Sequence, residues 1–276
     1  KLGEEPAKHG VDYVANDRVA RAAHAGVGAE SGALRQEPGV GGRDVRVRAD
    51  DGGDASVEVP AQGLLLAGRL GVDLHEHDGV ALGQLGRFNR SLFTGTVVAL
   101  TGSAGKTTTK EMIAAILGRK AAVLATTGNL NNEIGVPLTL LELHPGLRYA
   151  VIEMGAAKPG DIRYLGALVR PDVAVLTNAL PAHLQGFGSL QAVAATKGEI
   201  YDALGPDGVA VLNVDEPFAD AWLARIGART LLRASAMGAA DADVRAEDVK
   251  IHEGNASFRL VSAAGALRIA LGVPGV

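Results

Sequence analysis

The sequence predicts an α/β fold in which helices flank a mostly parallel sheet. Apolar runs of strand length, each ending in a polar or glycine-containing turn, lie at 96–100, 149–152, 173–176 and 209–212. Helical stretches separate these runs, and buried strands that alternate with helices are typical of a parallel sheet. The composition agrees, because only 4% of residues are aromatic in a chain that is 47% hydrophobic.

Residues 1–93 are predicted to form a smaller α/β domain that precedes the main sheet. The segment 43–59 alternates weakly enough to form strands joined by a turn. Apolar residues then recur at the spacing of an amphipathic helix, namely at Ala81, Leu82, Leu85, Phe88 and Leu92. We expect this helix to close the domain, with the boundary between residues 93 and 94.

The second predicted domain, 94–276, begins with the strand 96–100, a glycine-containing loop and a helix over 106–117. The remaining parallel strands follow in turn. After about residue 241 the pattern changes to short alternating runs at 249–252, 257–261 and 267–271, separated by glycines. These runs predict a small antiparallel meander.

Charge and composition exclude several classes of function. The formal net charge is -4, and the 27 basic and 31 acidic residues are mixed along the chain, so no cationic block favours nucleic acid as a partner. The chain has no cysteine, which excludes disulfides and thiolate metal sites. No run reaches the ~18 apolar residues of a membrane span. We expect a cytoplasmic monomer.

The strongest motif is the phosphate loop, Thr101–Thr108, which lies between a predicted strand and a predicted helix. Its residues are Thr101, Gly102, Ser103, Ala104, Gly105, Lys106, Thr107 and Thr108. Glycines let backbone N–H groups turn toward phosphate oxygens, Lys106 can reach the terminal phosphates, and the Thr107 hydroxyl can ligate magnesium. Leu100 stands where the general pattern has its first glycine. The alternative is a glycine-rich turn with an incidental lysine, which the strand-loop-helix context disfavours.

Two further polar residues follow predicted strands. Glu153 ends the run at 149–152, and Asn178 comes shortly after the run at 173–176. Ligands gather at the carboxyl edge of an open α/β sheet, so Glu153 is a candidate magnesium ligand beside the phosphate loop, and Asn178 a candidate nucleotide contact. A solvated acid or an ordinary turn is the alternative.

Three more groups are candidates with weaker signals. The loop containing Asn129, Asn131 and Asn132 suits a substrate rich in carbonyls and phosphates, although such residues also favour plain turns. His183 is isolated, and a lone histidine is more often structural. Lys197 lies next to an alanine-rich stretch of a helix that begins near Ser189, which predicts partial desolvation and nucleophilicity. The alternative is a solvated lysine paired with Glu199 or another acid.

Taken in this order, the segments resemble the central domain of the Mur ligases, over residues 80–275. The motifs that carry the resemblance are 101–108, 129–137, 153–155, 177–189, 197–199, Asn213 and Asp215. The resemblance implies an ATP-dependent amide ligase of peptidoglycan precursor synthesis that acts through an acyl phosphate. The asparagine-rich loop resembles the branch that adds D-alanyl-D-alanine to UDP-N-acetylmuramoyl-tripeptide, rather than the branches for other amino acids or the folylpolyglutamate synthases.

The resemblance also implies roles for single residues. Lys106, His183 and Lys197 would be catalytic, and Lys106 and Thr107 would bind the ATP phosphates and a first Mg²⁺ that Glu153 shares. A second Mg²⁺ would be held by His183 and by Lys197, which the family carries as a carbamate. The remaining contacts would be Gly102, Ser103, Ala104, Gly105, Thr108 and Asn178 with the nucleotide, and Asn129, Asn131 and Asn132 with the muramoyl substrate.

The resemblance further implies three domains. Residues 1–93 would be part of the UDP-substrate-binding domain, and 94–276 the ATP-binding domain, incomplete at its C-terminus. The family's C-terminal domain, which binds the incoming amine, would lie outside this sequence. We therefore expect the chain alone not to form the amide, because positioning of the amine is worth ~7–11 kcal/mol. Two alternatives remain, a nucleotide-binding module that is inactive without the third domain and a folylpolyglutamate-type ligase.

Overall fold

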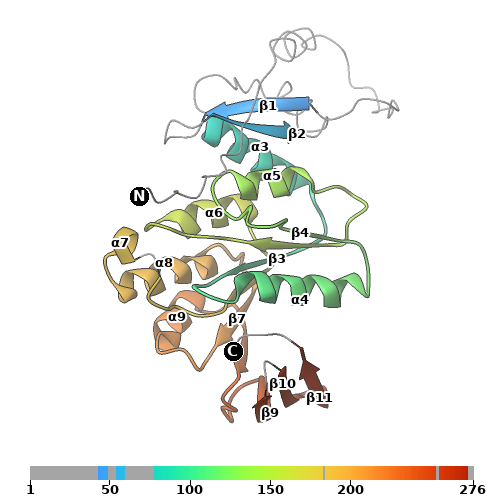
Figure 1. The fold of residues 1–276 in the computed structure, drawn as a ribbon, viewed down its shortest axis with the longest axis vertical. Helices are drawn as coiled ribbons and strands as arrows, with labels where there is room; N and C mark the ends of the chain where they lie inside the picture. The colour runs from blue at the N-terminus through green and yellow to red at the C-terminus, as the bar shows by residue number, and fades with distance from the viewer. Residues whose placement is uncertain (1–42, 49–53, 60–77, 183, 253–254, 273–276) are drawn as a thin grey trace, which may run out of the picture. The chain divides into compact units, whose positions relative to one another are not determined.

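The computed structural model describes residues 43–48, 54–59, 78–182, 184–252 and 255–272 (Figure 1). The chain divides into two compact units. The first comprises Lys1–Phe93 and Glu133–His144, and the second comprises Thr94–Asn132 and Pro145–Val276. The segment 133–144 therefore leaves the second unit and joins the first before the chain returns.

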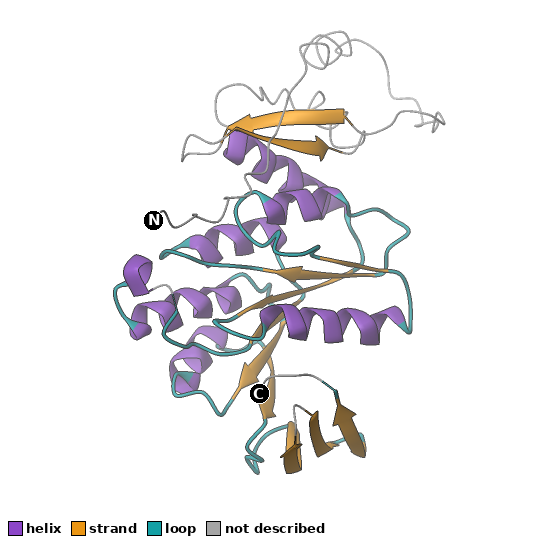
Figure 2. Cartoon of the chain, viewed as in Figure 1, coloured by secondary structure: helices purple, strands orange, loops and turns teal. Residues whose placement is uncertain are grey.

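The second unit contains the main sheet, whose strands are drawn in orange with helices in purple in Figure 2. The described strands run in the order β11-β10-β9-β8-β7-β6-β3-β5-β4. Six of them form its parallel part: β3 (Thr96–Thr101), β4 (Val123–Ala125), β5 (Tyr149–Glu153), β6 (Val173–Leu176), β7 (Val209–Asn213) and β8 (Thr230–Ser235). The antiparallel meander consists of β9 (Val244–His252), β10 (Asn255–Ser262) and β11 (Gly265–Leu271). Both the parallel sheet and the meander confirm the sequence-based predictions.

Strand β3 lies in the interior of the sheet, between β5 and β6. Its residues from Val97 to Thr101 are all buried, as expected of an interior strand in a parallel sheet. Leu100 of β3 pairs with Glu153 of β5, and Thr101 pairs with Leu176 of β6. The carboxyl ends of these three strands therefore meet at one edge of the sheet.

Helices alternate along the chain with the strands of this sheet, as the sequence predicts. They are α4 (Lys106–Gly118), α6 (Asp161–Val169), α7 (Leu184–Phe187), α8 (Leu190–Asp202) and α9 (Ala219–Ile226). Helix α4 packs on β4 and β5, whereas α8 packs on β3 and β6 and also contacts α6 and α9. The Ser189 hydroxyl accepts a hydrogen bond from Ala192 N at 3.1 Å, so α8 begins where its capping residue predicts.

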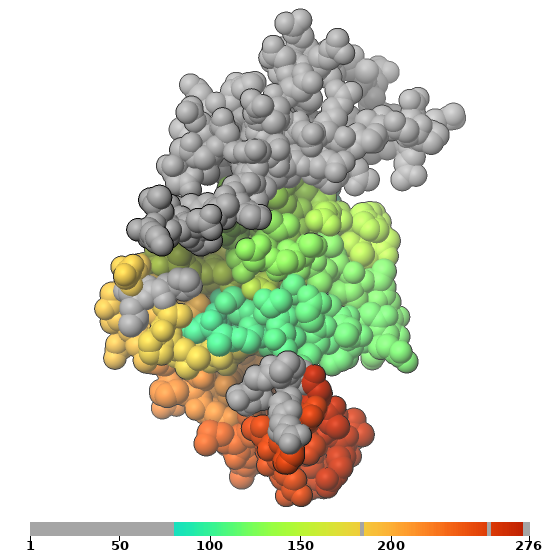
Figure 3. Space-filling model, in the orientation of Figure 1, coloured from blue at the N-terminus to red at the C-terminus, as the bar shows by residue number. Residues whose placement is uncertain are grey.

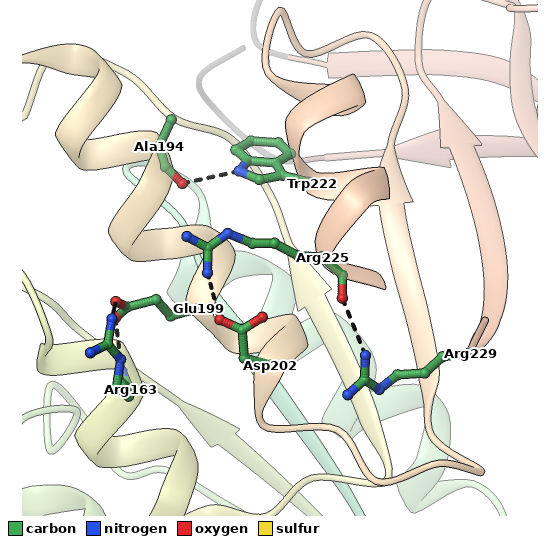
Figure 4. Close-up of polar contacts among 7 residues, drawn as sticks. All are labelled: Arg163, Ala194, Glu199, Asp202, Trp222, Arg225 and Arg229. Carbon is green, nitrogen blue, oxygen red and sulfur yellow. Dashed lines mark hydrogen bonds and ion pairs between the residues drawn. The ribbon is translucent and has the colours of Figure 1, made fainter. Parts of the chain in front are cut away.

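Polar contacts fix α8 on two sides (Figure 4). On the side of α6, the carboxylate of Glu199 accepts hydrogen bonds from Arg163 N at 3.1 Å and Arg163 Nη2 at 2.6 Å. On the side of α9, Trp222 Nε1 donates to Ala194 O at 3.0 Å. The helix that carries Lys197 is therefore held by both of its neighbours.

The first unit contains α3 (Asp78–Leu92), α5 (Gly135–Leu141) and an antiparallel pair, β1 (Arg43–Arg48) and β2 (Asp54–Val59). The amide Nδ2 of Asn89 in α3 donates to Leu140 O at 2.8 Å and Leu143 O at 2.9 Å, which satisfies carbonyls at the end of α5. Helix α3 and the strand pair follow their predictions.

Three short elements escape sequence-based prediction. Strand β4 has three residues, β8 carries Arg233 in a half-exposed run, and α5 contains a glycine and a proline within seven residues. None of these offers a full hydrophobic period, so packing rather than pattern specifies them. No helix among the described residues combines the length and apolar character needed to cross a membrane.

Candidate functional site

The phosphate loop joins β3 to α4 at the carboxyl edge of the sheet. Gly105 caps α4 with φ of 74°, a left-handed conformation that favours glycine. At Gly102 a Cβ would lie 1.8 Å from Thr177 Oγ1, so no side chain fits there. Leu100 departs from the general motif because it is fully buried within β3, where the strand continues to Thr101 before the chain turns.

Asn178 shapes this loop from the neighbouring strand. Its Oδ1 accepts hydrogen bonds from Ser103 N at 3.1 Å and Ala104 N at 2.9 Å, and its Nδ2 donates to Ala104 O at 3.2 Å. The N–H groups of Ser103 and Ala104 are thus engaged by Asn178. The N–H groups available for an anion are those in the first turn of α4, which has no side-chain cap.

The side chains of that first turn are open to a ligand. The Lys106 ammonium makes no hydrogen bond or ion pair with any residue that the structure describes. Thr107 and Thr108 are exposed, and α4 forms part of the surface in the space-filling view (Figure 3). A glycine loop, an uncapped helix N-terminus and an uncommitted lysine together fit a nucleotide polyphosphate.

Glu153 faces the first turn of α4 from the end of β5. Its Oε2 accepts a hydrogen bond from Thr107 Oγ1 at 3.0 Å, and its Oε1 accepts one from Asn131 Nδ2 at 2.8 Å. Glu153 is 1% exposed. The backbone also joins this cluster, since Gly155 N donates to Asn131 O at 2.7 Å. The structure therefore brings together three of the predicted site residues.

The pair formed by Thr107 and Glu153 fits a magnesium ion. A hydroxyl and a carboxylate are hard oxygen ligands, and they stand beside a helix N-terminus where phosphates would supply more oxygens. No group of three or more histidine, cysteine, aspartate or glutamate side chains that could hold a metal occurs in the described part of the chain. Mg²⁺ is commonly bound through one or two carboxylates plus phosphates and water.

Lys197 reaches the same edge from α8. Its ammonium is buried and donates to Gly102 O at 3.1 Å. Burial, and to a smaller extent the positive charge of Lys106, lower the pKa of Lys197 to about 8. Glu199 pairs with Arg163 instead, so the alternative of a solvated lysine paired with Glu199 is wrong. Residues two apart on a helix do not face each other, which explains why Lys197 and Glu199 do not pair.

The pKa of Lys197 predicts how stability depends on pH. The folded state loses this proton near pH 8, whereas the unfolded chain keeps it to about pH 10.5. The unfolded state therefore binds more protons between these values, and stability rises with pH there. Between pH 7 and 9.5 we expect the free energy of unfolding to rise by about 2 kcal/mol relative to Lys197→Met. Urea titrations of both proteins at each pH measure this difference, and parallel pH profiles would contradict it.

The other predicted residues lie apart from this cluster or outside the described chain. Asn129 and Asn132 are exposed in the loop that contains Asn131. His183 lies outside the described residues. Asp215 accepts hydrogen bonds from Ser235 Oγ at 2.6 Å and from the backbone of residues 236 and 237, so it links the ends of β7 and β8.

Sequence reasoning missed Lys110 and Thr126, two buried polar residues next to the cluster, because neither belongs to a recognisable motif.

Comparisons with known proteins agree with this geometry. The family model for the Mur ligase middle domain matches residues 100–276. The UDP-N-acetylmuramoyl-tripeptide--D-alanyl-D-alanine ligase of Escherichia coli (strain K12) is 41% identical over 234 residues, which cover 83% of this chain and 52% of that protein. The chain thus spans about half the length of this curated relative.

Solved structures show the same relationship. MurF from Acinetobacter baumannii aligns with a TM-score of 0.69 and 38% identity, over 72% of this chain and 44% of that one. MurF ligase from Thermotoga maritima in complex with ADP aligns with a TM-score of 0.62 and 35% identity, over 72% of this chain and 45% of that one. The match to the family model covers the phosphate loop from Leu100 onward, together with Glu153 and Lys197. The chain therefore belongs to the Mur ligase family.

Proposed function

We propose that this chain provides the nucleotide-binding part of an ATP-dependent ligase that adds D-alanyl-D-alanine to UDP-N-acetylmuramoyl-tripeptide. The observation that carries the proposal is the Thr107–Glu153 pair beside the uncapped N-terminus of α4, with Lys106 uncommitted next to it. The 41% identity to a ligase of that name favours this reaction over a folylpolyglutamate-type one. The ADP in a related structure supports the choice of nucleotide.

In this proposal the residues act by binding and by neutralising charge. Bound Mg-ATP supplies the phosphoryl group that turns the tripeptide carboxylate into an acyl phosphate, which the dipeptide amine then attacks with loss of phosphate. Lys106 and the first N–H groups of α4 hold the terminal phosphates, and Thr107 and Glu153 hold Mg²⁺. These contacts would reduce the electrostatic repulsion between the attacking carboxylate and the polyphosphate.

The proposal also includes a role for Lys197, as a carbamate that binds a metal ion. Its neutral amine attacks carbon dioxide, a bond forms between Nζ and carbon, and the proton passes to solvent, which leaves an anionic carbamate. That group, with His183, is suited to hold a second Mg²⁺, because the cation needs anionic oxygens and Glu153 already faces Thr107. The low pKa of Lys197 supports this role, since the neutral amine is accessible near neutral pH.

The remaining assignments are parts of the same proposal. Asn129 and Asn132 are exposed and would face the muramoyl substrate, while Asn131 orients Glu153. Residues 1–93 would belong to a UDP-substrate-binding domain and 94–276 to the ATP-binding domain. The absence of cysteine and of a cationic block is consistent with a cytoplasmic monomer that acts on small molecules.

Lys106→Ala tests the phosphate site. We expect the affinity for Mg-ATP to fall about 10- to 100-fold, because a charge-assisted contact to phosphate is worth ~1.5–3 kcal/mol. Isothermal titration calorimetry measures the affinity, and Lys120→Ala, an exposed lysine just beyond α4, is the matched control. Equal affinities for the wild type and Lys106→Ala, with both proteins folded, would show that the phosphate-loop assignment is wrong.

A further inference from the structure

Lys110 is a buried cation that the proposed reaction does not yet use. It lies on α4 one turn after Lys106, and its side chain is 1% exposed. A lysine is almost never fully buried without a partner, because taking an ammonium out of water is costly. The position of Lys110 therefore calls for a compensating contact within the second unit.

The contacts of Lys110 point toward the sheet. Its Nζ donates to Thr126 O at 2.6 Å, a short charge-assisted hydrogen bond. Nζ also lies 3.0 Å from Glu111 Oε1, but the Glu111 side chain is 66% exposed. The inward partner of the buried ammonium is thus the backbone carbonyl of Thr126, directly after β4.

Thr126 in turn holds the backbone of Glu153. Its Oγ1 accepts a hydrogen bond from Glu153 N at 3.0 Å, and its own N–H donates to Val151 O at 3.0 Å. Thr126 is 1% exposed, so no solvent competes with these bonds. Lys110 is therefore connected to Glu153 through a single buried residue.

The same helix reaches the Glu153 side chain directly. Thr107, three residues before Lys110, donates to Glu153 Oε2 at 3.0 Å. Helix α4 is thus joined to the end of β5 twice, by Thr107 at the carboxylate and by Lys110 through Thr126 at the backbone. Two connections between the same elements restrict both the sliding and the rotation of α4 relative to Glu153.

We propose that Lys110 is a positioning residue that sets the Glu153 carboxylate at the right distance from Thr107 for the nucleotide-bound Mg²⁺. The inference rests on the proposed function, in which these two residues hold that ion. Mg²⁺ requires near-octahedral oxygen ligands at 2.0–2.1 Å, so a small displacement of a ligand lowers its affinity. A lysine suits this position because its four-carbon stem spans the interior and its ammonium binds a carbonyl strongly.

Lys110→Met tests the inference, because methionine keeps the length and apolar stem but removes the ammonium. With Mn²⁺ as the probe ion and ADP as the nucleotide, electron paramagnetic resonance measures free and bound Mn²⁺. We expect Lys110→Met to weaken Mn²⁺ binding to the protein–ADP complex about 10-fold, the lower end of effects from groups that orient metal ligands. ADP affinity in EDTA should change less than about twofold, since a positioning residue touches no phosphate.

A double-mutant cycle with Glu153→Gln separates positioning from general loosening. If Lys110 acts through Glu153, Lys110→Met should have little further effect once the carboxylate is gone. An equal loss of Mn²⁺ affinity in both backgrounds would overturn the inference, as would unchanged Mn²⁺ affinity in Lys110→Met. Glu111→Gln removes only the exposed partner of Lys110 and should bind Mn²⁺ like the wild type.

Two further results keep the outcomes distinct. Thr126→Val removes the hydroxyl that holds Glu153 N but leaves the carbonyl that binds Lys110. We expect Thr126→Val to weaken Mn²⁺ binding as Lys110→Met does. If Lys110→Met does not fold, Thr126→Val tests the inference in its place. Normal Mn²⁺ affinity in Thr126→Val would overturn the inference. If Glu153→Gln alone leaves Mn²⁺ affinity unchanged, the proposed magnesium site fails, and this inference with it.

Discussion

Lys197→Ala is expected to abolish the carbamate signal of the protein and the binding of a second metal ion. In the wild type with ¹³C-bicarbonate and Mg²⁺, ¹³C NMR should show a carbamate resonance, because burial lowers the pKa of the Lys197 amine to about 8. Raising the pH from 7 to 9 should strengthen this resonance, since the neutral fraction of a lysine with pKa about 8 rises from ~10% to ~90%.

Lys158→Ala is the control for that experiment, because Lys158 is exposed and should not contribute to the resonance. Loss of the carbamate should lower the affinity for the second metal ion by more than about 100-fold. Changes to groups that merely orient a ligand already lower metal affinity by ~10–100-fold, and the carbamate would be a ligand itself. Metal titration of the ADP complex measures this affinity. A wild-type spectrum at pH 9 without a carbamate resonance would contradict the role of Lys197.

Trp222→Ala is expected to destabilise the second unit by about 3–5 kcal/mol, the usual cost of truncating a large buried aromatic residue. Trp222 is 1% exposed, donates to Ala194 O at 3.0 Å, and lies against Gly198, where a Cβ would stand 2.7 Å from its ring. The change would leave a cavity between α8 and α9 beside the helical turn that carries Lys197. Total stabilities are only ~5–15 kcal/mol, so this is a large fraction.

Trp222→Phe is the matched variant, because it keeps an aromatic ring but loses the hydrogen bond and part of the indole volume, for a smaller expected cost of about 1–3 kcal/mol. Urea denaturation followed by far-UV circular dichroism measures both variants, since Trp222 is the chain's one tryptophan and fluorescence would be lost. A cost below about 1 kcal/mol for Trp222→Ala would mean that the contact of α8 with α9 contributes little to stability.

The phosphate loop and the central strands could be predicted because their signals are local. A fully apolar run, two glycines and a lysine at the start of a helix specify β3, the loop and α4 within about 20 residues. Strand β8 could not be predicted, because its half-exposed residues include Arg233 and resemble an irregular segment. Its place in the sheet depends on pairing with β7, which no local pattern records.

The contacts that define the candidate site depend on residues far apart in sequence. The sequence predicts that Lys197 is desolvated, but not that it donates to Gly102 O, 95 residues away. The resemblance implies that Asn131 contacts the substrate, but no local pattern predicts the hydrogen bond that its side chain donates to Glu153. Lys110 offers no signal at all, since a lysine beside Glu111 in a helix normally indicates a solvated face.

The position of β3 between two strands that come later in the chain has a consequence for folding. The hydroxyl of Thr101 bonds Met154 O across 53 residues, and Val97 N bonds Asp172 across 75. Such long-range pairings must pay loop-closure entropy before they gain contacts, so they form slowly. During synthesis the phosphate loop leaves the ribosome well before β5 and β6 do, at ~5–20 residues per second. For several seconds the apolar strand β3 has no partner, and in that interval the nascent chain is open to aggregation and to chaperone binding.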